Sequence, residues 1–293
     1  MRVTITSQGY EAAIESLGAE LKSLKSPEGK EYIWSSDPAH WARSSPLLFP
    51  SIGNVRNNKT IIAGKEYAMP KHGFAREMEF SVLRQAENKV TFTITDNAFT
   101  HESYPFSFQL HLTYELEGKN LKMTYLVINR DIRPMLYHIG AHPGFNCPLE
   151  PEEALSDYVI EFAQDESWES YVYDLKNMCF FADKRMVHDA SGKTLRLSRE
   201  LFDQDALYFY HTHSHSVALK NPATGKGIRM DYPDFASIAF WTPMGGKAPF
   251  VCLEPWNGSA IFEDEDDYFA NKRDIQILEA GQRKEYRLKI CIL

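Results

Sequence analysis

Glu254 stands where a carboxyl group could do acid–base chemistry. It follows the apolar run Phe250–Leu253 and precedes Pro255 and Trp256, so we expect it at the end of a buried strand. Loss of hydration penalises the charged form of a carboxyl group and raises its pKa toward neutrality, as a general acid or base requires. A structural, salt-bridged glutamate at a strand end is the alternative interpretation.

Two histidines occupy similar positions. His142 lies between Gly140 and Pro143, a setting that ends a strand and exposes the side chain, and His72 precedes a glycine at another such junction. A single histidine is commonly a structural residue whose hydrogen bonds are satisfied. Two histidines and Glu254 at strand-to-loop junctions together predict an acid–base site.

Arginines and aromatic residues in the same segments suggest what the site would bind. Arg56 and Arg76 could hold hydroxyl groups or a phosphate through two parallel hydrogen bonds, with surface ion pairs as the alternative. Trp256, Phe74 and Phe145 offer flat apolar surfaces that match the C–H faces of a pyranose ring. Aromatic residues also fill protein cores, so this second indication is weak alone.

Other possible centres are less well supported. His211, His213 and His215 alternate along the chain as in a zinc site, but no acidic residue or cysteine follows within five positions, which favours a polar hairpin turn. The run Glu263–Asp267 lacks the ligand spacing and the central glycine of a calcium loop, which favours a solvated surface loop. Cys252 is interpreted as a packing residue. No metal and no cofactor are expected.

Composition narrows the function classes further. The chain has 293 residues and a net charge of -8, which argues against nucleic acid and against an anionic membrane surface as partners. It has no stretch of 18 apolar residues, and its first ten residues alternate in polarity as no signal peptide does. The cysteines form no CxxC pair and are expected to be reduced and buried: Cys147, Cys179, Cys252 and Cys291. A cytoplasmic protein is the simplest interpretation.

Period-2 alternation extends along the whole chain, whereas helical patterns are short. Strands are predicted at residues 3–5, 19–24, 32–34, 90–95, 106–117, 121–129, 158–162, 206–210, 216–219, 227–232, 237–242, 250–254 and 285–292. Residues 100–103 and 198–204 are predicted to form single helical turns. Many short strands with aromatic residues at 13% indicate an all-β protein, a large antiparallel β-sandwich or barrel, and one domain over residues 1–293.

Five segments, taken in order, resemble the aldose 1-epimerase (galactose mutarotase-like) family. They read PLLFPSIG, KHGFAR, IGAHPGF, FDQDAL and CLEPWNG. The similarity is greatest to the branch found with lactose-operon proteins and to the related hexose-phosphate epimerases. The resemblance implies a large antiparallel β-sandwich with the sugar in a cleft on one sheet.

The resemblance also implies roles for individual residues. It places the general base on Glu254 and the general acid on His142, with His72 contacting the sugar near its ring oxygen. Asp205 matches the substrate-binding aspartate, and Asp203 is a competitor two positions away. Related sequences carry an arginine where this chain has Ile52-Gly53-Asn54, so Arg56 is expected to reach the sugar only if the segment stays extended.

The expected reaction is interconversion of the α and β anomers of a hexose by acid–base catalysis. One carboxylate and one imidazolium suffice, since the proton of the C1 hydroxyl leaves while the ring oxygen gains one. A hexose-6-phosphate 1-epimerase, with Arg56 and Arg76 on the phosphate, is the first alternative. A sugar-binding module without turnover is the second. The expected partner is a small-molecule sugar, free or phosphorylated, bound by a monomer or homodimer.

Overall fold

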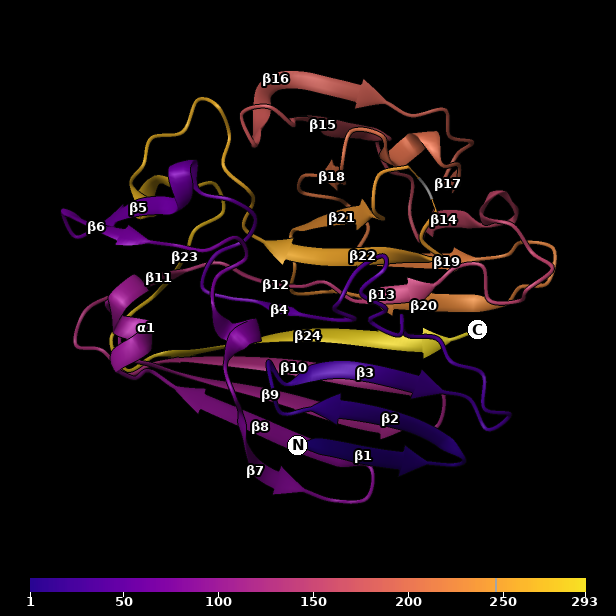
Figure 1. Ribbon diagram of the computed structural model, residues 1–293, viewed down its shortest axis with the longest axis horizontal. Coiled ribbons are helices and arrows are strands. Elements are labelled where there is room, and N and C mark those ends of the chain that lie inside the picture. The colour runs from indigo at the N-terminus through magenta and orange to yellow at the C-terminus, as the bar shows by residue number, and fades with distance from the viewer. Residues whose placement is uncertain (246) are drawn as a thin grey trace.

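Two large antiparallel sheets dominate the computed structural model, which describes residues 1–245 and 247–293 (Figure 1). The nine-stranded sheet has the order β17 (Thr194–Arg196), β14 (Val159–Phe162), β19 (Ser216–Lys220), β20 (Gly227–Asp231), β24 (Arg283–Ile292), β10 (Asn120–Asn129), β9 (Phe108–Glu117), β8 (Lys89–Thr95) and β7 (Ser81–Gln85). The eight-stranded sheet has the order β16 (Cys179–Val187), β15 (Glu169–Asp174), β18 (Leu207–Phe209), β21 (Ser237–Trp241), β22 (Phe250–Asn257), β12 (Ile139–Ala141) and β4 (Leu47–Leu48), with β13 (Gly144–Asn146) also paired to β22.

Smaller elements flank the two sheets. They are the three-stranded sheet of β1 (Arg2–Ser7), β2 (Tyr10–Glu15) and β3 (Glu20–Lys25), the pair β5 (Lys59–Ile62) and β6 (Lys65–Ala68), the pair β11 (Met135–Tyr137) and β23 (Gln276–Leu278), and the helix α1 (Ala98–Ser103). Single 3-10 turns occur at Arg56–Asn58, Ala75–Glu77, Leu155–Asp157, Glu200–Phe202 and Phe269–Asn271. None of the helices in the described ranges has the length and apolar character needed to cross a membrane.

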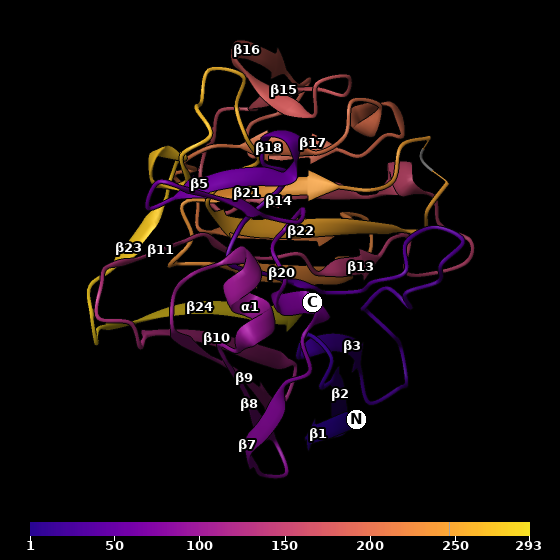
Figure 2. The same ribbon diagram turned by 60° about the vertical axis from the view of Figure 1, so that its left-hand side comes forward.

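The main core lies between the two large sheets. Along β9 and β10, buried and half-buried residues alternate, so each strand turns every second side chain into the core. Val251 and Leu253 of β22 join that core from the other sheet. After rotation of the molecule, β21 and β22 cross its middle with β24, β10 and β9 below them (Figure 2). Phe250, Cys252, Glu254 and Trp256 alternate with Val251 and Leu253 and therefore face away from this core.

Most of the predicted strands and both single helical turns are confirmed, but the strand predicted at residues 32–34 is wrong. The backbone N–H of Tyr32 donates to the carbonyl of Leu24, and that of Trp34 donates to the carbonyl of Gly144. The chain here passes between β3 and β13 and forms one isolated bridge with each of them, so no continuous strand pairing develops.

Candidate active site

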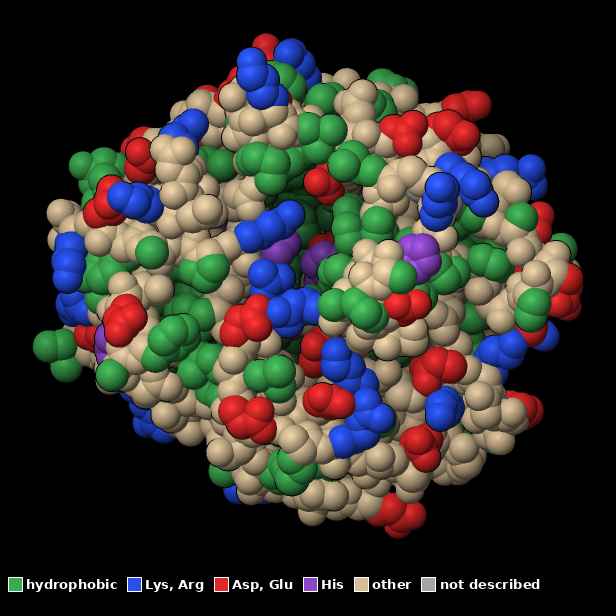
Figure 3. Space-filling model, in the orientation of Figure 1, with side chains coloured by type: hydrophobic (Ala, Val, Ile, Leu, Met, Phe, Trp, Pro, Cys, Tyr) green, Lys and Arg blue, Asp and Glu red, His purple; other side chains and the backbone are tan. Residues whose placement is uncertain are grey.

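A pocket of about 270 Å³ opens on the face of the eight-stranded sheet that points away from the main core. Its lining residues come from segments far apart in the sequence: Trp41, Gly53, Asn54, Lys71, His72, Arg76, His142, Tyr173, Phe180, Asp205, Ala206, Trp241, Glu254, Trp256 and Ala260. In the space-filling view the molecule is hollowed near its centre, with histidine side chains inside and Lys and Arg side chains around the opening (Figure 3). Six of the residues that the sequence singled out meet here.

Glu254 lies within β22 rather than at its end, which corrects the sequence expectation. The strand continues through Pro255 to Asn257, and every residue of it is buried. The N–H of Leu253 donates to the carbonyl of Pro143, on the side of β22 where β12 and β13 lie. The backbone nitrogen of Pro255, two residues later in the strand, faces the same side and has no hydrogen to donate. Because β12 and β13 are interrupted on that side, Pro255 removes no strand-to-strand hydrogen bond, and the strand runs on.

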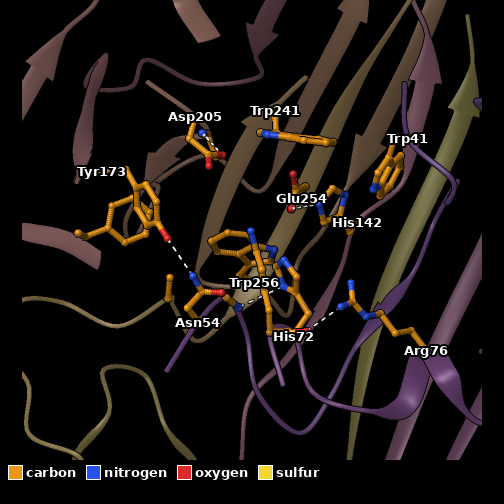
Figure 4. A pocket seen from close by; sticks show the side chains of 15 residues that line it. Trp41, Asn54, His72, Arg76, His142, Tyr173, Asp205, Trp241, Glu254 and Trp256 are labelled. Atoms are coloured by element: carbon orange, nitrogen blue, oxygen red, sulfur yellow. Dashed lines mark hydrogen bonds and ion pairs between the residues drawn. The ribbon is translucent and has the colours of Figure 1, made fainter. Parts of the chain in front are cut away.

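The interruption between β12 and β13 positions His142. Gly140 of β12 pairs with Trp256, and Gly144 of β13 pairs with Cys252, so His142 stands opposite the middle of β22. Its Nε2 lies 3.1 Å from Oε2 of Glu254. The two side chains point toward each other at the base of the pocket (Figure 4). Both are almost fully buried, with relative exposures of 7% for His142 and 1% for Glu254.

Burial shifts the pKa of both members of this pair. It raises the pKa of Glu254 well above the ordinary carboxyl value, and the nearby charge of Asp205 adds to this. Burial, with a smaller contribution from the cations Lys71 and Arg76, lowers the pKa of His142 to about 3. Both shifts favour a protonated carboxyl group and a neutral imidazole over a carboxylate and an imidazolium, and the pair shares one proton in either form.

His72 and Asp205 reach the pocket from strained backbone. Their φ angles are 66° and 74°, in the left-handed region that residues other than glycine rarely adopt. The N–H of Gly53 donates to Nδ1 of His72 over 3.1 Å, which leaves Nε2 as the protonated nitrogen of the neutral ring. His72 can therefore donate a hydrogen bond to a ligand.

The backbone around His72 admits no larger neighbour. Gly73 has φ 69°, and a Cβ added there would lie 2.2 Å from the carbonyl oxygen of Phe49. Only glycine fits both the angle and the space. The glycine of the His-Gly-Phe segment is thus required for this turn, which directs His72 into the pocket.

Polar groups opposite Glu254 and His142 complete the pocket. Asp205 accepts the N–H of Ala206 at Oδ1 over 2.8 Å, so Oδ2 is left for a ligand. Nδ2 of Asn54 donates to the hydroxyl of Tyr173 over 3.3 Å. Asp203, the competitor of Asp205, is exposed and does not line the pocket.

Three tryptophans form the apolar walls. Trp41 stacks on the ring of His142 with centroids 4.8 Å apart, and Trp241 meets the same ring edge-on at 5.5 Å. Trp256 packs on Tyr208, and its Nε1 has no hydrogen-bond partner within residues 1–245 and 247–293. A buried donor of this kind costs free energy unless a ligand or water accepts from it.

Of the two predicted arginines, only Arg76 lines the pocket. Its Nη2 donates to the carbonyl of Lys71 over 2.8 Å. Arg56 does not reach the pocket; it begins the 3-10 turn Arg56–Asn58, which follows the extended Val55. Arg56 donates from Nε to Asp267 over 3.2 Å and from Nη2 to the carbonyl of Glu265 over 2.8 Å. It thus anchors the loop that follows β22.

We expect Arg56→Ala to weaken folding without impairing turnover. Loss of the hydrogen bonds to Asp267 and Glu265 should lower the free energy of unfolding by ~1–2 kcal/mol. The KM for a sugar should stay within about twofold of the wild-type value, since the side chain lies outside the pocket. Urea denaturation and steady-state kinetics measure the two effects, and a large rise in KM at unchanged stability would contradict this placement.

The structure also shows what the histidine cluster and the acidic run Glu263–Asp267 contact. His211 contacts Asp274 over 2.8 Å, His213 contacts Glu166 over 3.6 Å and His215 contacts the carbonyl of Phe235 over 3.1 Å. The three imidazoles therefore face three different partners. The acidic run is not merely solvated, since the side chain of Glu265 is 6% exposed and pairs with buried Lys272 over 3.1 Å.

Several lining residues were missed from sequence: Trp41, Asn54, Lys71, Tyr173, Phe180 and Trp241. Asn54 directly follows the segment PLLFPSIG and Lys71 is the first residue of KHGFAR, so their neighbours carried a usable signal. Tyr173 and Phe180 come from β15 and β16, where aromatic residues alternate as in any packed strand. Only the fold brings these last two to the pocket.

Comparison with known proteins identifies the family to which this chain belongs. The model of the family described as aldose 1-epimerase matches residues 1–290. This chain belongs to the aldose 1-epimerase family. It is 34% identical over 288 residues to the plasmid form of protein LacX from Lactococcus lactis subsp. lactis, with 94% of each chain covered.

Solved structures of aldose 1-epimerase relatives share the whole fold. A galactose mutarotase-like protein from Lactobacillus casei ATCC 334 superposes with a TM-score of 0.92 at 30% identity, with 100% of both chains covered. A galactose mutarotase related enzyme from Lactobacillus acidophilus gives a TM-score of 0.92 at 27% identity, covering 100% of this chain and 97% of the other. The predicted galactose mutarotase-like β-sandwich is confirmed.

Proposed function

We propose that this aldose 1-epimerase family member interconverts the α and β anomers of a hexose. The contact of 3.1 Å between Glu254 and His142 at the base of the pocket carries the proposal. A carboxyl group and an imidazole that share one proton can take a proton from one oxygen of a sugar and give one to another. Tryptophan walls and the polar groups of His72 and Asp205 fit a pyranose ring with its hydroxyls.

The reaction follows from the proton accounting. Transfer of the shared proton from Glu254 to His142 gives a carboxylate and an imidazolium. Glu254 then takes the proton of the C1 hydroxyl while His142 protonates the ring oxygen, which breaks the bond between C1 and the ring oxygen. Rotation about the C1–C2 bond and reclosure through the reverse transfers give the other anomer. No net proton is gained or lost.

Burial of the pair favours the protonation states that follow ring opening. Once the ring has opened, Glu254 is protonated and His142 is neutral, which is the form that desolvation favours. Relative to the carboxylate and imidazolium that act on the closed ring, the shifted pKa values therefore favour the step that opens the ring.

The pH dependence of kcat/KM should reflect the shifted pKa values of the free enzyme. The active pair carries one proton, so activity falls at acidic pH when His142 takes a second one. Because the pKa of His142 is lowered to about 3, the plateau should extend well below the ordinary imidazole value of 6.5. The alkaline limb should lie well above the ordinary carboxyl range, since the pKa of Glu254 is raised. Anomer exchange measured from acidic to alkaline pH tests this, and an acid limb near pH 6.5 would contradict it.

A phosphorylated hexose is the second candidate substrate, and the cations at the pocket favour it. Lys71 is exposed and Arg76 half-buried, and both line the pocket. A phosphate there would gain charge-assisted hydrogen bonds. Arg56, which the sequence suggested as a phosphate ligand, takes no part because it lies outside the pocket.

Lys71→Ala separates the two substrates. For a hexose 6-phosphate, loss of a charge-assisted hydrogen bond should raise KM by ~10-fold or more. For the free hexose, KM should change little. The matched control is Lys65→Ala on β6, an exposed lysine that does not line the pocket. Equal effects of Lys71→Ala on both substrates would remove the case for the phosphate.

Two measurements together distinguish an enzyme from a sugar-binding module without turnover. Calorimetry reports binding, and saturation-transfer NMR reports exchange between anomers. The presence of both Glu254 and His142 in one pocket supports an enzyme.

The four cysteines are free and buried, which supports a reducing compartment such as the cytoplasm.

A further inference from the structure

Cys252 lies directly beside the catalytic pair, although it does not line the pocket. It stands two residues before Glu254 on β22, so both side chains project from the same face of the strand. Opposite them is His142. One donor atom from each of the three side chains lies within 4.8 Å of the other two. This is the one such group of three found within the described part of the chain.

The donor set matches a particular class of cation. Thiolate, imidazole and carboxylate are the ligands of Zn²⁺, and the soft thiolate also favours Cd²⁺, whereas Mg²⁺ and Ca²⁺ require oxygen ligands. Zinc bonds of about 2.0–2.3 Å in a tetrahedron place donor atoms roughly 3.3–3.8 Å apart. The donors of Glu254 and His142 are already 3.1 Å apart, and the thiol of Cys252 lies within 4.8 Å of both, so closing the site requires the thiol to approach by up to about 1 Å.

The charges of such a site balance inside the protein. The cation displaces one proton from the thiol of Cys252 and one from the carboxyl group of Glu254, and both protons leave to solvent. Two anionic ligands then neutralise the divalent cation, and the neutral imidazole of His142 completes three positions. The buried site carries no net charge, so the penalty for an isolated buried ion does not apply. The fourth position faces the pocket.

We propose that His142, Cys252 and Glu254 form a site for a thiophilic divalent cation, Zn²⁺ or Cd²⁺, which inhibits reversibly by occupying the groups that handle the sugar protons. Metal binding itself is independent of the proposed function. Its inhibitory consequence rests on that function, because it removes Glu254 and His142 from proton transfer. Cation and sugar therefore exclude each other.

Binding is tested by adding Cd²⁺ to the reduced protein and recording the ultraviolet charge-transfer band of a cadmium–thiolate bond. The wild-type protein should develop this band with one equivalent of Cd²⁺ and lose it on addition of EDTA. Cys252→Ala and Cys252→Ser should abolish the band and weaken binding of Zn²⁺ by ~10-fold or more. Loss of a residue that merely holds a metal ligand already costs that much, so loss of a ligand should cost at least as much. The matched control is Cys291→Ala, which removes a buried cysteine on β24 and should leave the band and the affinity for Zn²⁺ unchanged.

The wild-type spectrum decides the outcome even if a Cys252 variant folds poorly. No thiolate band at one equivalent, or a band that survives in a folded Cys252→Ala, would overturn the site. His213→Ala should leave the band unchanged, since that exposed imidazole is a surface competitor for metal.

Inhibition is tested separately. Zn²⁺ should raise the apparent KM for the sugar in the wild-type protein, and Cys252→Ala should keep kcat while its inhibition constant for Zn²⁺ rises by ~10-fold or more. Cadmium binding without any inhibition would overturn the inhibitory role. If the protein showed no anomer exchange at all, the proposed function would fail, while the Cd²⁺ band would still report the metal site.

Discussion

Replacing Glu254 by glutamine should lower kcat for anomer exchange by ~10²–10⁴-fold. The amide keeps the size of the side chain and its place beside His142, but it can neither accept the proton of the C1 hydroxyl nor share one with the imidazole. Polarimetry of a freshly dissolved pure anomer measures the rate, and the known slow reaction in water sets the floor. A near-normal rate in Glu254→Gln would exclude the assigned role.

The fold should tolerate this substitution well. Because the pKa of Glu254 is raised in the folded state, the neutral carboxyl stabilises the native protein at low pH, and this contribution is lost as the pH rises through the folded pKa. Glutamine cannot ionise, so the variant should melt at or above the wild-type temperature at neutral and alkaline pH. Glu166→Gln is the matched control, since Glu166 has a side chain only 6% exposed and lies outside the pocket. It should keep wild-type kcat.

His142→Ala is the second change with a large expected effect, again ~10²–10⁴-fold in kcat. It removes the group proposed to protonate the ring oxygen and leaves Glu254 without its partner. It also removes the ring on which Trp41 stacks, so KM should rise as well. The rate is measured by the same polarimetric assay.

The control for His142→Ala is another buried histidine. His188 contacts the hydroxyl of Ser170 over 2.8 Å and does not line the pocket. His188→Ala should disturb packing to a similar degree but leave kcat unchanged. Equal losses of kcat in the two variants would mean that His142 acts through the fold and not through proton transfer.

The strands were predictable from sequence because alternation states directly which side chains enter the core. The position of Glu254 was predicted wrongly, at the end of a strand, because Pro255 ordinarily ends pairing. Whether a proline does so depends on its neighbour, and here the neighbouring strands are interrupted at His142. That interruption is a long-range feature which the residues around Pro255 do not encode.

The pocket itself was predictable only in part. Segments with glycine and proline marked His72 and His142, because constrained backbone is needed to aim a side chain, whereas Asp205 was indicated only by the family resemblance. Arg56 was placed in the pocket on the assumption of an extended segment, but it begins the 3-10 turn Arg56–Asn58 and its side chain pairs with Asp267. Tyr173 entered the pocket without any local signal, since its place depends on the pairing of β15 with β18.

The most direct test of the account is saturation-transfer NMR on an equilibrated hexose. Saturating the C1 proton of one anomer in the presence of wild-type protein should attenuate the signal of the other anomer in proportion to enzyme concentration, and Glu254→Gln should abolish the transfer. If hexoses and hexose phosphates bind to the wild-type protein but the anomers exchange no faster than in buffer, the shared proton of Glu254 and His142 does not serve catalysis.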